Sequence, residues 1–474
     1  MKQRFVNLQL PAGGDETAAA EILVEDGKIR DVHRVPPPAP GAAPETVAPR
    51  DVEIIDLDGA LMLPGVIDGH VHFDDPGFTH RENFASGTRA AAAGGVTCVV
   101  DMPCTTLPPV TSAANLENKL AVVAPKAHVD FMLWGGVSGN AIAAPHWQAD
   151  LAALVEAGVA SIKVYMLSGM ETFTDLGRDQ VREVLQQTRR IGIPVGVHAE
   201  DRELVHRLTA DLRAQGREAA LDYAASRPPA AEVAAVSTMR DLCRETGATV
   251  HIVHVASGAA LDVIAEAADE GLPMSGETCP QYLAFTELDL QELGAVLKTA
   301  PVVKSESDRA RLWQGLAAGE LAYVATDHAA GQWPDEKHTG SIWSDYGGVP
   351  GVELMLPYLY SAGVRERRIT LERLTEITAS APARFFGIDN RKGRLEPGFD
   401  ADMVVLEQGA RWTVRAAEMH NLNRYTPLDG HALKGRVRAT WVRGRLAYER
   451  RTDGTEFFAP PGTGEWVRRE RHIG

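Results

Sequence analysis

The feature that most constrains the fold is an alternation, between Leu61 and about Gly387, of short apolar runs with longer segments rich in Ala, Leu and Glu. Such apolar runs are typical of buried strands, and the segments between them are long enough to hold a crossover helix each. We predict eight strands, which end near His70, Met102, Trp134, Val164, His198, His254, Gly276 and Asp327. Eight consecutive strand–helix units predict an α/β protein with a closed (β/α)₈ or TIM barrel.

The two ends of the chain predict a second, smaller domain. The N-terminal part mixes β-like runs, Glu21–Val24 and Val52–Leu57, with the proline-rich stretch Pro36–Pro44, which we expect to be a loop. After Arg394 the chain returns to β-like runs broken by glycine, so it is expected to rejoin the N-terminal part. The predicted domains are a discontinuous β-sandwich from residues 1–60 and 388–474, a barrel over 61–387, and a polar C-terminal arm over 452–474.

Charge and composition narrow the classes of function. The net charge of −16 argues against a nucleic-acid or anionic-membrane partner, because either would favour a basic surface. No apolar run reaches the roughly 18 residues of a membrane span, and Met1–Leu10 lacks the basic-then-apolar order of a secretory signal, so we expect a cytoplasmic protein. The cysteines contain no CxxC pair and are expected to be packed thiols; they are Cys98, Cys104, Cys243 and Cys279.

Polar residues follow several of the predicted strands at the point where each strand ends. The run Leu61–His72 is expected to be one buried strand that finishes with His70 and His72, whose spacing places both imidazoles on one side of an extended chain. Three further strands are expected to end at His198, His254 and Asp327. A lone histidine at a strand end is more often a hydrogen-bonded core residue, but four of them with an aspartate predict a metal site at the carboxyl ends of the barrel strands.

Lys163 lies inside an apolar run, Ala160–Tyr165, that should be a central barrel strand. Burial of a free ammonium group there would be costly, although an ion pair or a position at the mouth of the strand would relieve the cost. With the histidines nearby, another explanation is favoured: a neutral lysine amine reacts with CO₂ to give a carbamate that bridges two metal ions. The predicted ligands are therefore His70, His72, Lys163 (N6-carboxylated, bridging), His198, His254 and Asp327.

The order of these residues resembles the cyclic-amidohydrolase branch of the amidohydrolase superfamily, which includes dihydroorotases, allantoinases, hydantoinases and dihydropyrimidinases. The similar motifs run along nearly the whole chain: PGVIDGHVH, GTRAAAAGGVT, VVDMP, KVYMLSG, VHAED, HIVHVASG, ETCPQYL, ATDHA, GGVPGVE and KGRLEPGFDADMVV.

The resemblance implies a binuclear centre. His70, His72 and Asp327 would bind the more buried ion, His198 and His254 the other, and carboxylated Lys163 would bridge them. Zinc is the expected metal, and a hydroxide between the two ions would attack the carbonyl carbon of a ring amide. Asp327 would be both ligand and catalytic general base and acid. Relatives are commonly dimers or tetramers, so a homodimer or homotetramer is expected.

The identity of the cyclic amide is less constrained. Asp74 stands where dihydroorotases typically carry an arginine, and an aspartate would repel a substrate carboxylate unless Arg81, Arg89 or another cation reaches the site. Ser168 stands where hydantoinases and dihydropyrimidinases usually place a tyrosine. Gln281, in contrast, resembles the dihydropyrimidinases. Allantoinase is the leading prediction, with dihydroorotase and the hydantoinase or dihydropyrimidinase type as alternatives.

By motif position, the candidate substrate contacts are Ser168, Cys279 and Gly347, although packing alone would explain Cys279 and a turn would explain Gly347. Two other classes are weighed against a binuclear hydrolase. A non-catalytic assembly protein of this fold is disfavoured because all six ligand positions are intact. A mononuclear deaminase is disfavoured because a deaminase does not need the bridging lysine.

Overall fold

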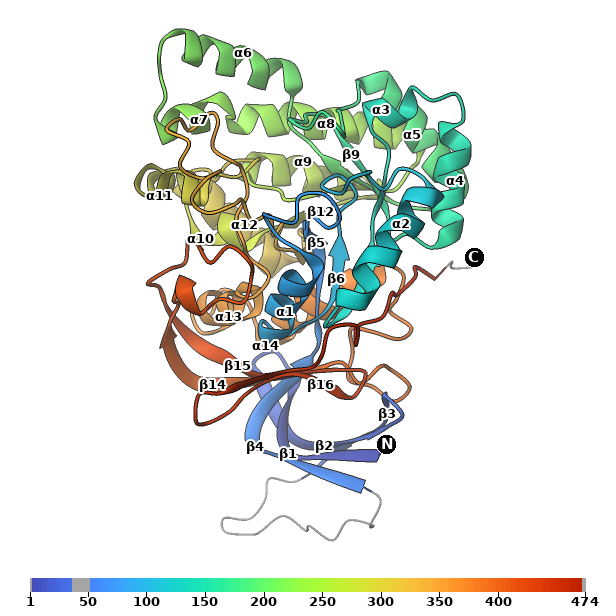
Figure 1. The fold of residues 1–474 in the computed structure, drawn as a ribbon, viewed down its shortest axis with the longest axis vertical. Helices are drawn as coiled ribbons and strands as arrows, with labels where there is room; N and C mark the ends of the chain where they lie inside the picture. The colour runs from blue at the N-terminus through green and yellow to red at the C-terminus, as the bar shows by residue number, and fades with distance from the viewer. Residues whose placement is uncertain (1, 36–51, 471–474) are drawn as a thin grey trace.

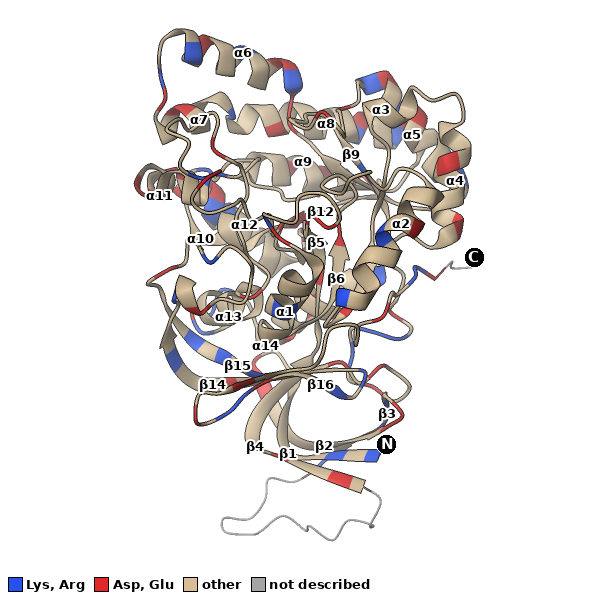
Figure 2. Cartoon of the chain, in the orientation of Figure 1, with Lys and Arg blue, Asp and Glu red and all other residues tan. Residues whose placement is uncertain are grey.

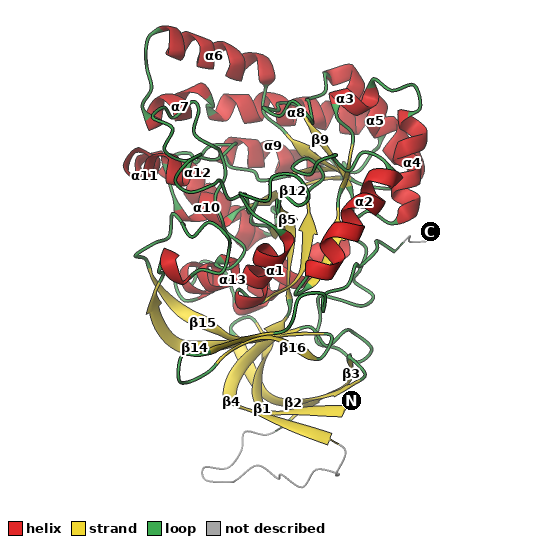
Figure 3. Cartoon of the chain, in the orientation of Figure 1, coloured by secondary structure: helices red, strands yellow, loops and turns green. Residues whose placement is uncertain are grey.

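A computed structural model describes residues 2–35 and 52–470, so the predicted loop Pro36–Pro44 lies outside the described residues. Figure 1 shows a curved sheet at one end of the long axis and, above it, a larger body of strands enclosed by helices. Figure 3 shows that the two parts differ in content, since the helices gather around the upper strands. Within the described ranges, no helix combines the length and the apolar character that a membrane crossing requires.

The lower sheet is built from both ends of the chain. Its spatial order is β17-β16-β15-β14-β4-β1-β2-β3. The two halves meet where β4 pairs antiparallel with β14, from Leu61 opposite Leu406 to Pro64 opposite Met403. The strands are β1 (Lys2–Gly13), β2 (Glu16–Glu25), β3 (Lys28–Arg34), β4 (Val52–Pro64), β14 (Met403–Thr413), β15 (Ala432–Val442), β16 (Arg445–Arg450) and β17 (Glu456–Phe458).

The lower sheet curls over its own apolar face. Phe5 on β1 meets Trp441 on β15 edge to face, with ring centroids 5.3 Å apart, although β4 and β14 lie between these strands in the sheet. Both rings belong to a buried cluster that also holds Ile22 and Met403. Alternate residues of the strands supply this cluster, as expected for strands with one buried face.

The upper strands form the predicted barrel. Eight successive positions are occupied by parallel strands, with the third strand divided at Trp134 into β7, which pairs with β6, and β8, which pairs with β9. The ring closes where Val71 bridges His328 in parallel and His72 N donates to His328 O at 2.7 Å. The strands are β5 (Val66–Val71), β6 (Val96–Asp101), β7 (Asp130–Leu133), β8 (Gly135–Gly136), β9 (Ile162–Tyr165), β10 (Val195–His198), β11 (Val250–Ile252), β12 (Met274–Thr278) and β13 (Tyr323–Val324). The predicted fold class is confirmed.

Helices follow the barrel strands, and polar caps explain where several of them begin. The side chains of Asn83, Ser112, Asp201, Ser257 and Ser305 accept backbone N–H groups in the first turns of α1, α2, α6, α9 and α12. The helices are α1 (Phe84–Ala93), α2 (Ala113–Val123), α3 (Gly139–Ile142), α4 (Trp147–Ala157), α5 (Arg178–Ile191), α6 (Arg202–Ala214), α7 (Ala220–Ser226), α8 (Pro229–Thr246), α9 (Gly258–Asp269), α10 (Pro280–Ala284), α11 (Glu287–Leu293), α12 (Glu306–Ala318), α13 (Met355–Tyr358), α14 (Leu371–Thr375) and α15 (Ala381–Phe385).

The run Leu61–His72 contains parts of two strands, so the prediction of one continuous strand is wrong. Strand β4 belongs to the lower sheet and ends at Pro64, past the predicted boundary at residue 60, while β5 begins the barrel at Val66. Gly65 N donates to Asp402 O at 2.9 Å, and a side chain at Gly65 would overlap Thr97. The chain turns here because proline has no N–H to continue the ladder and only glycine fits against Thr97.

The end of the chain packs along β7. Phe131 N donates to Glu465 O at 3.0 Å and Val467 N donates to Phe131 O at 2.8 Å, which forms a parallel bridge between Phe131 and Trp466. Farther along, the Arg469 guanidinium donates to the carbonyl oxygen of Ala160 at 3.0 Å. Of the predicted arm, Glu456–Phe458 is therefore strand β17 of the lower sheet, and residues 465–467 lie beside β7 on the side away from β6.

A buried ammonium group joins the barrel to the lower sheet. Lys392 Nζ lies 2.7 Å from Asp130, 2.7 Å from Asp402 and 3.1 Å from Asp400. Asp130 begins β7, and Asp402 immediately precedes β14. Lys392, Asp130 and Asp402 are at least 96% buried as side chains, so this ion cluster has little solvent to stabilise its charges.

We predict that Lys392→Met lowers the free energy of unfolding by about 3–5 kcal/mol, because it leaves three buried carboxylates without their shared cation. Urea unfolding followed by circular dichroism measures the change. The matched control is Lys434→Met, which removes an exposed ion pair with Glu366 and should cost less than about 1 kcal/mol. Equal losses in the two variants would contradict the structural importance of Lys392.

Candidate active site

Six predicted ligands lie at the carboxyl end of the barrel. His70 is in β5, Lys163 is in β9 and His198 ends β10. His72, His254 and Asp327 follow β5, β11 and β13 within three residues. Parallel strands of one barrel all finish at the same rim, so residues far apart in the sequence meet there.

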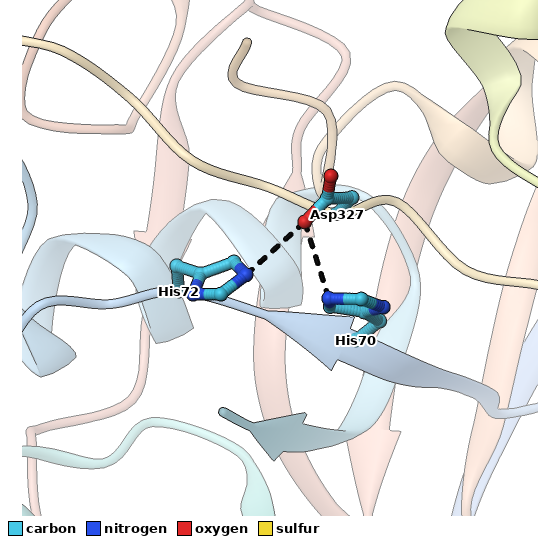
Figure 4. A group of neighbouring side chains, drawn as sticks. All are labelled: His70, His72 and Asp327. Atoms are coloured by element: carbon cyan, nitrogen blue, oxygen red, sulfur yellow. Dashed lines mark ion pairs between the residues drawn. The ribbon is translucent and has the colours of Figure 1, made fainter. Parts of the chain in front are cut away.

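The first group of neighbouring candidate metal ligands consists of His70, His72 and Asp327. Asp327 Oδ1 is 3.2 Å from His70 Nε2 and 3.1 Å from His72 Nε2 (Figure 4). One potential ligand atom from each residue lies within 4.8 Å of the others. Burial raises the pKa of Asp327, but the two imidazoles lower it further, so its pKa lies well below the usual range. The ionised carboxylate and two imidazoles form a triangle suited to one divalent cation.

His198 and His254 form the second group. His198 Nδ1 is 3.1 Å from His254 Nε2, and their ring centroids are 4.7 Å apart. The His254 ring is 5.4 Å from that of His70, which places the second group beside the first. Lys163 is fully buried, and its Nζ lies 4.8 Å from the centroid of Tyr165, whose ring stacks on His198.

Several nitrogen atoms of these candidate metal ligands have no hydrogen-bond partner. Among the described residues, Lys163 Nζ, His70 Nε2 and His254 Nδ1 are buried without one, even though His70 Nε2 is close to Asp327. Burial lowers the pKa of Lys163, against the raising effects of Cys104 and Asp327, which favours the neutral amine. Unpaired buried nitrogen atoms are rare because each costs about 1–3 kcal/mol. The donor set therefore fits bound cations.

Glu277 orients His70 from behind. Its Oε1 is 2.7 Å from His70 Nδ1, and its Oε2 is 3.2 Å from His251 Nε2. Burial raises the pKa of Glu277, but the hydrogen bonds from His251 and His70 lower it more, so the group is ionised. An ionised acceptor at Nδ1 fixes the proton there and leaves the Nε2 lone pair directed at the first group.

Glu200 has the same relation to His198. Its Oε2 is 2.8 Å from His198 Nε2 and accepts a hydrogen bond of 2.5 Å from Arg227 Nη1. Burial raises the pKa of Glu200, yet Arg227 lowers it to well below the usual range. The ionised carboxylate holds His198 with Nδ1 toward His254.

The backbone is strained at two candidate ligands, His254 and Asp327, just after their strands end. His254 has φ of 45° and Asp327 has φ of 49°, a left-handed conformation that costs residues other than glycine about 1–3 kcal/mol. Beside Asp327, Thr326 N donates to Asp68 Oδ1 at 3.0 Å and the Thr326 hydroxyl donates to Asp68 Oδ2 at 2.5 Å. These bonds from β5 hold the end of the very short β13, so the surrounding structure maintains the strain at Asp327.

A cavity of about 650 Å³ opens over the two groups of donors. His72, His198, His254 and Asp327 reach its surface. Ser168 and Gly347 also line it, whereas Cys279 does not and is fully buried. Cavities of this size enclose small organic ligands, so the geometry admits a small cyclic substrate.

Asp74, which stands at the position of the dihydroorotase arginine, does not line the cavity. Asp74 is fully buried, and neither of its carboxylate oxygens has a hydrogen-bond partner among the described residues. Burial raises the pKa of Asp74 well above its usual range, against the lowering effects of His72 and Arg81. Its φ of 55° turns the side chain inward, which strand alternation does not foresee.

Other residues of the site did not stand out in the sequence. Glu277 lies in the motif ETCPQYL and Glu200 in the motif VHAED. Each is a charged residue in or directly after an apolar strand, and such a position indicates a buried, paired carboxylate. Arg227 lines the cavity from a loop, where an arginine has no distinctive sequence context, whereas Arg81, which the sequence offered as a candidate cation, also lines it.

Comparison with known proteins identifies the family. Residues 61–447 match the model of the amidohydrolase family. The chain belongs to the amidohydrolase family. This match covers all six candidate ligands, from His70 to Asp327, and it extends into the C-terminal strands of the lower sheet.

Individual amidohydrolases resemble the chain over nearly its full length. The allantoinase of Rubrobacter xylanophilus is 37% identical over 98% of this chain and 96% of its own. The allantoinase of Deinococcus radiodurans is 36% identical over 85% of this chain and 88% of its own. The structure of an L-hydantoinase (dihydropyrimidinase) from Arthrobacter aurescens superposes with a TM-score of 0.90 at 30% identity and covers 98% of this chain and 99% of its own.

We predict that Glu277→Gln weakens divalent metal binding by about 10- to 100-fold, because a neutral amide no longer fixes the proton on His70 Nδ1. Metal titration by calorimetry, with unfolding checked in parallel, measures the effect. Glu266→Gln, which changes an exposed carboxylate paired with Arg240, is the control and should leave metal affinity unchanged. Unaltered affinity in Glu277→Gln would refute the orienting role.

Proposed function

We propose that this amidohydrolase is an allantoinase, which adds water across a ring C–N bond of allantoin to give allantoate. The observation that carries the proposal is the near-complete coverage of this chain by allantoinases at 36–37% identity, in a structure that brings the six donors together under a cavity. A small, neutral, polar ring suits a cavity of about 650 Å³ that combines imidazoles, arginines and aromatic rings.

Two divalent ions, zinc by preference, are proposed as the cofactor. His70, His72 and Asp327 would hold one, and His198 and His254 the other. Imidazole and carboxylate ligands suit zinc, and the unpaired nitrogen atoms support cation binding at both places. When bound, the ions would supply Lewis acidity toward the amide carbonyl and increase the acidity of the attacking water.

Lys163 is proposed to be carboxylated. Its buried Nζ has no hydrogen-bond partner among the described residues and lies 4.8 Å from the ring of Tyr165, which stacks on His198; its lowered pKa favours the neutral amine. The amine would attack CO₂ to form an N–C bond, and the released proton would leave a carbamate anion. The carbamate would serve as an anionic ligand beside the histidines and would partly neutralise the positive charge of the bound ions.

Different side chains would have different roles in the hydrolysis. An Asp327 carboxylate oxygen would accept a proton from the attacking water and deliver it to the ring nitrogen that leaves. Glu277 and Glu200 would keep His70 and His198 in the orientations that ligation requires. Arg227 would keep Glu200 ionised. Each step uses a group already held in place, which reduces reorganisation during the reaction.

A hydantoinase is the second candidate, favoured by the TM-score of 0.90 with an L-hydantoinase structure. A dihydroorotase is less well supported, even though Asp74 does not reach the cavity. Binding of a carboxylate-bearing ring would need a free cation, and the cavity arginines are already paired: Arg81 with Glu336 and Arg227 with Glu200.

The protein is further proposed to be cytoplasmic and to form a homodimer or homotetramer, as its family resemblance implies. Four buried cysteines without disulfides suit a reducing compartment.

The test of the function is a hydrolysis screen of zinc-reconstituted protein, prepared with bicarbonate, against allantoin, dihydroorotate, dihydrouracil and a 5-substituted hydantoin. We expect the highest kcat/KM with allantoin. Preference for the substituted hydantoin would replace the proposal by its second candidate, and preference for dihydroorotate would show that an arginine is released from its carboxylate. No turnover of any of the four with two metals bound would refute the proposed substrate.

We predict that Lys163→Ala loses one or both metals and nearly all activity, because the bridging anion is absent. Metal content by atomic absorption and activity with added acetate or propionate measure this, since short carboxylates should partly restore both. Lys119→Ala is not a suitable control because it is buried, whereas the exposed Lys434→Ala should keep both metals. Full metal content and activity in Lys163→Ala would disprove the bridge.

A further inference from the structure

Arg81 forms part of the wall of the cavity, in the loop that follows β5. Its guanidinium group makes a forked pair with Glu336: Nε donates at 3.0 and 2.9 Å and Nη2 donates at 2.7 Å. Glu336 lies in the loop after β13, 255 residues away in the sequence. The pair therefore joins the loops after the first and last strands of the barrel.

Two aromatic rings hold the same guanidinium group. Its central carbon lies 4.4 Å from the ring centroid of Tyr346 and 4.9 Å from that of Phe78. Tyr346 and Phe78 line the cavity as well. Stacking and the fork restrict the rotation of a side chain that is 19% exposed, so little conformational entropy remains to be lost on ligand binding.

The loops that carry Arg81 and Glu336 are themselves tied down. Asn423 Nδ2 donates to His80 O at 3.0 Å and to Arg81 O at 2.5 Å, and Trp333 N donates to Asn423 Oδ1 at 2.8 Å. Glu336 also accepts from Gln332 N at 2.9 Å. Both members of the pair are thus fixed before any ligand arrives.

The fork leaves one nitrogen of Arg81 unused. Nη1 makes no hydrogen bond to any described residue, whereas Nε and Nη2 are committed to Glu336. Glu336 also neutralises the charge of Arg81, so the group that remains is an N–H donor beside a carboxylate. Such a donor suits a neutral carbonyl oxygen, because an anionic ligand would be repelled by Glu336.

Arg227, the other cavity arginine discussed above, has a different task. It donates to Glu200, which holds His198, so its substitution would disturb a candidate metal ligand. Arg81 contacts none of the six candidate ligands through a hydrogen bond. It is therefore the arginine of this pair that can contact a substrate without being needed to build the candidate metal centre.

We propose that Arg81 Nη1 forms a subsite that donates to the carbonyl oxygen of an exocyclic ureido group on the substrate ring. This inference rests on the proposed function, since allantoin is a hydantoin ring that bears a ureido substituent. The subsite would make Arg81 a determinant of specificity for ureido-substituted rings over the bare hydantoin ring. The clamp by Phe78, Tyr346 and Glu336 would orient the donor in advance.

The test compares kcat/KM for allantoin and for unsubstituted hydantoin in the wild type and in Arg81→Met. We expect the allantoin-to-hydantoin ratio to fall about 10- to 100-fold, mainly through a higher KM for allantoin, as for the loss of a hydrogen bond to a charged donor. The ratio is insensitive to a loss of active enzyme, because both substrates use the same preparation. Arg89→Met is the matched control, since Arg89 stacks on Phe458 outside the cavity lining, and its ratio should equal that of the wild type.

Arg81→Lys is a second variant in case Arg81→Met does not fold. A single ammonium nitrogen can keep the ion pair with Glu336 but offers no second nitrogen, so the ratio should also fall. An unchanged ratio in a folded Arg81 variant, with allantoin still hydrolysed, overturns the subsite and leaves the proposed function intact. A wild-type enzyme that hydrolyses hydantoin but not allantoin overturns both.

Discussion

The arrangement of the site follows from one constraint, which is that eight parallel strands end at the same rim of a closed barrel. This rim brings four buried imidazoles, a buried lysine and the partly exposed Asp327 together beneath the cavity. Figure 2 shows the acidic and basic residues spread over the outer helices and the lower sheet. Unpaired nitrogen atoms in such a place favour bound cations, and the rest of the site serves to hold them in that geometry.

Buried carboxylates fix the orientation of several candidate metal ligands. Glu277 fixes His70, Glu200 fixes His198, and Asp68 fixes the end of β13 through Thr326. Each carboxylate is fully buried, so its hydrogen bonds act in a low-dielectric environment where they are strong. The strained backbone at Asp327 is held on one side by the bonds of Thr326 to Asp68 and on the other by His72 N, which donates to His328 O.

The contacts that join the barrel to the lower sheet and the residues that line the cavity lie at opposite ends of the barrel. The ion cluster of Lys392, the turn at Gly65 and the packed C-terminal arm lie where the barrel meets the lower sheet. The cavity and its loops lie at the carboxyl end of the strands, where Arg81, Glu336 and Asn423 fasten one loop to another. Loops at that end can therefore differ in the groups they present to a ligand while the barrel beneath them is maintained.

The sequence alone determined the barrel, the union of the two chain ends and the six candidate ligands, because strand periodicity and polar residues at strand ends are local signals. It did not determine that Leu61–His72 divides at Gly65 or that Asp74 turns inward, since packing against Thr97 and a left-handed φ decide these points. The pairing of Glu277 with His70 spans 207 residues, and that of Arg81 with Glu336 spans 255. Such partners are chosen by three-dimensional proximity, which only the closed barrel and its loops establish.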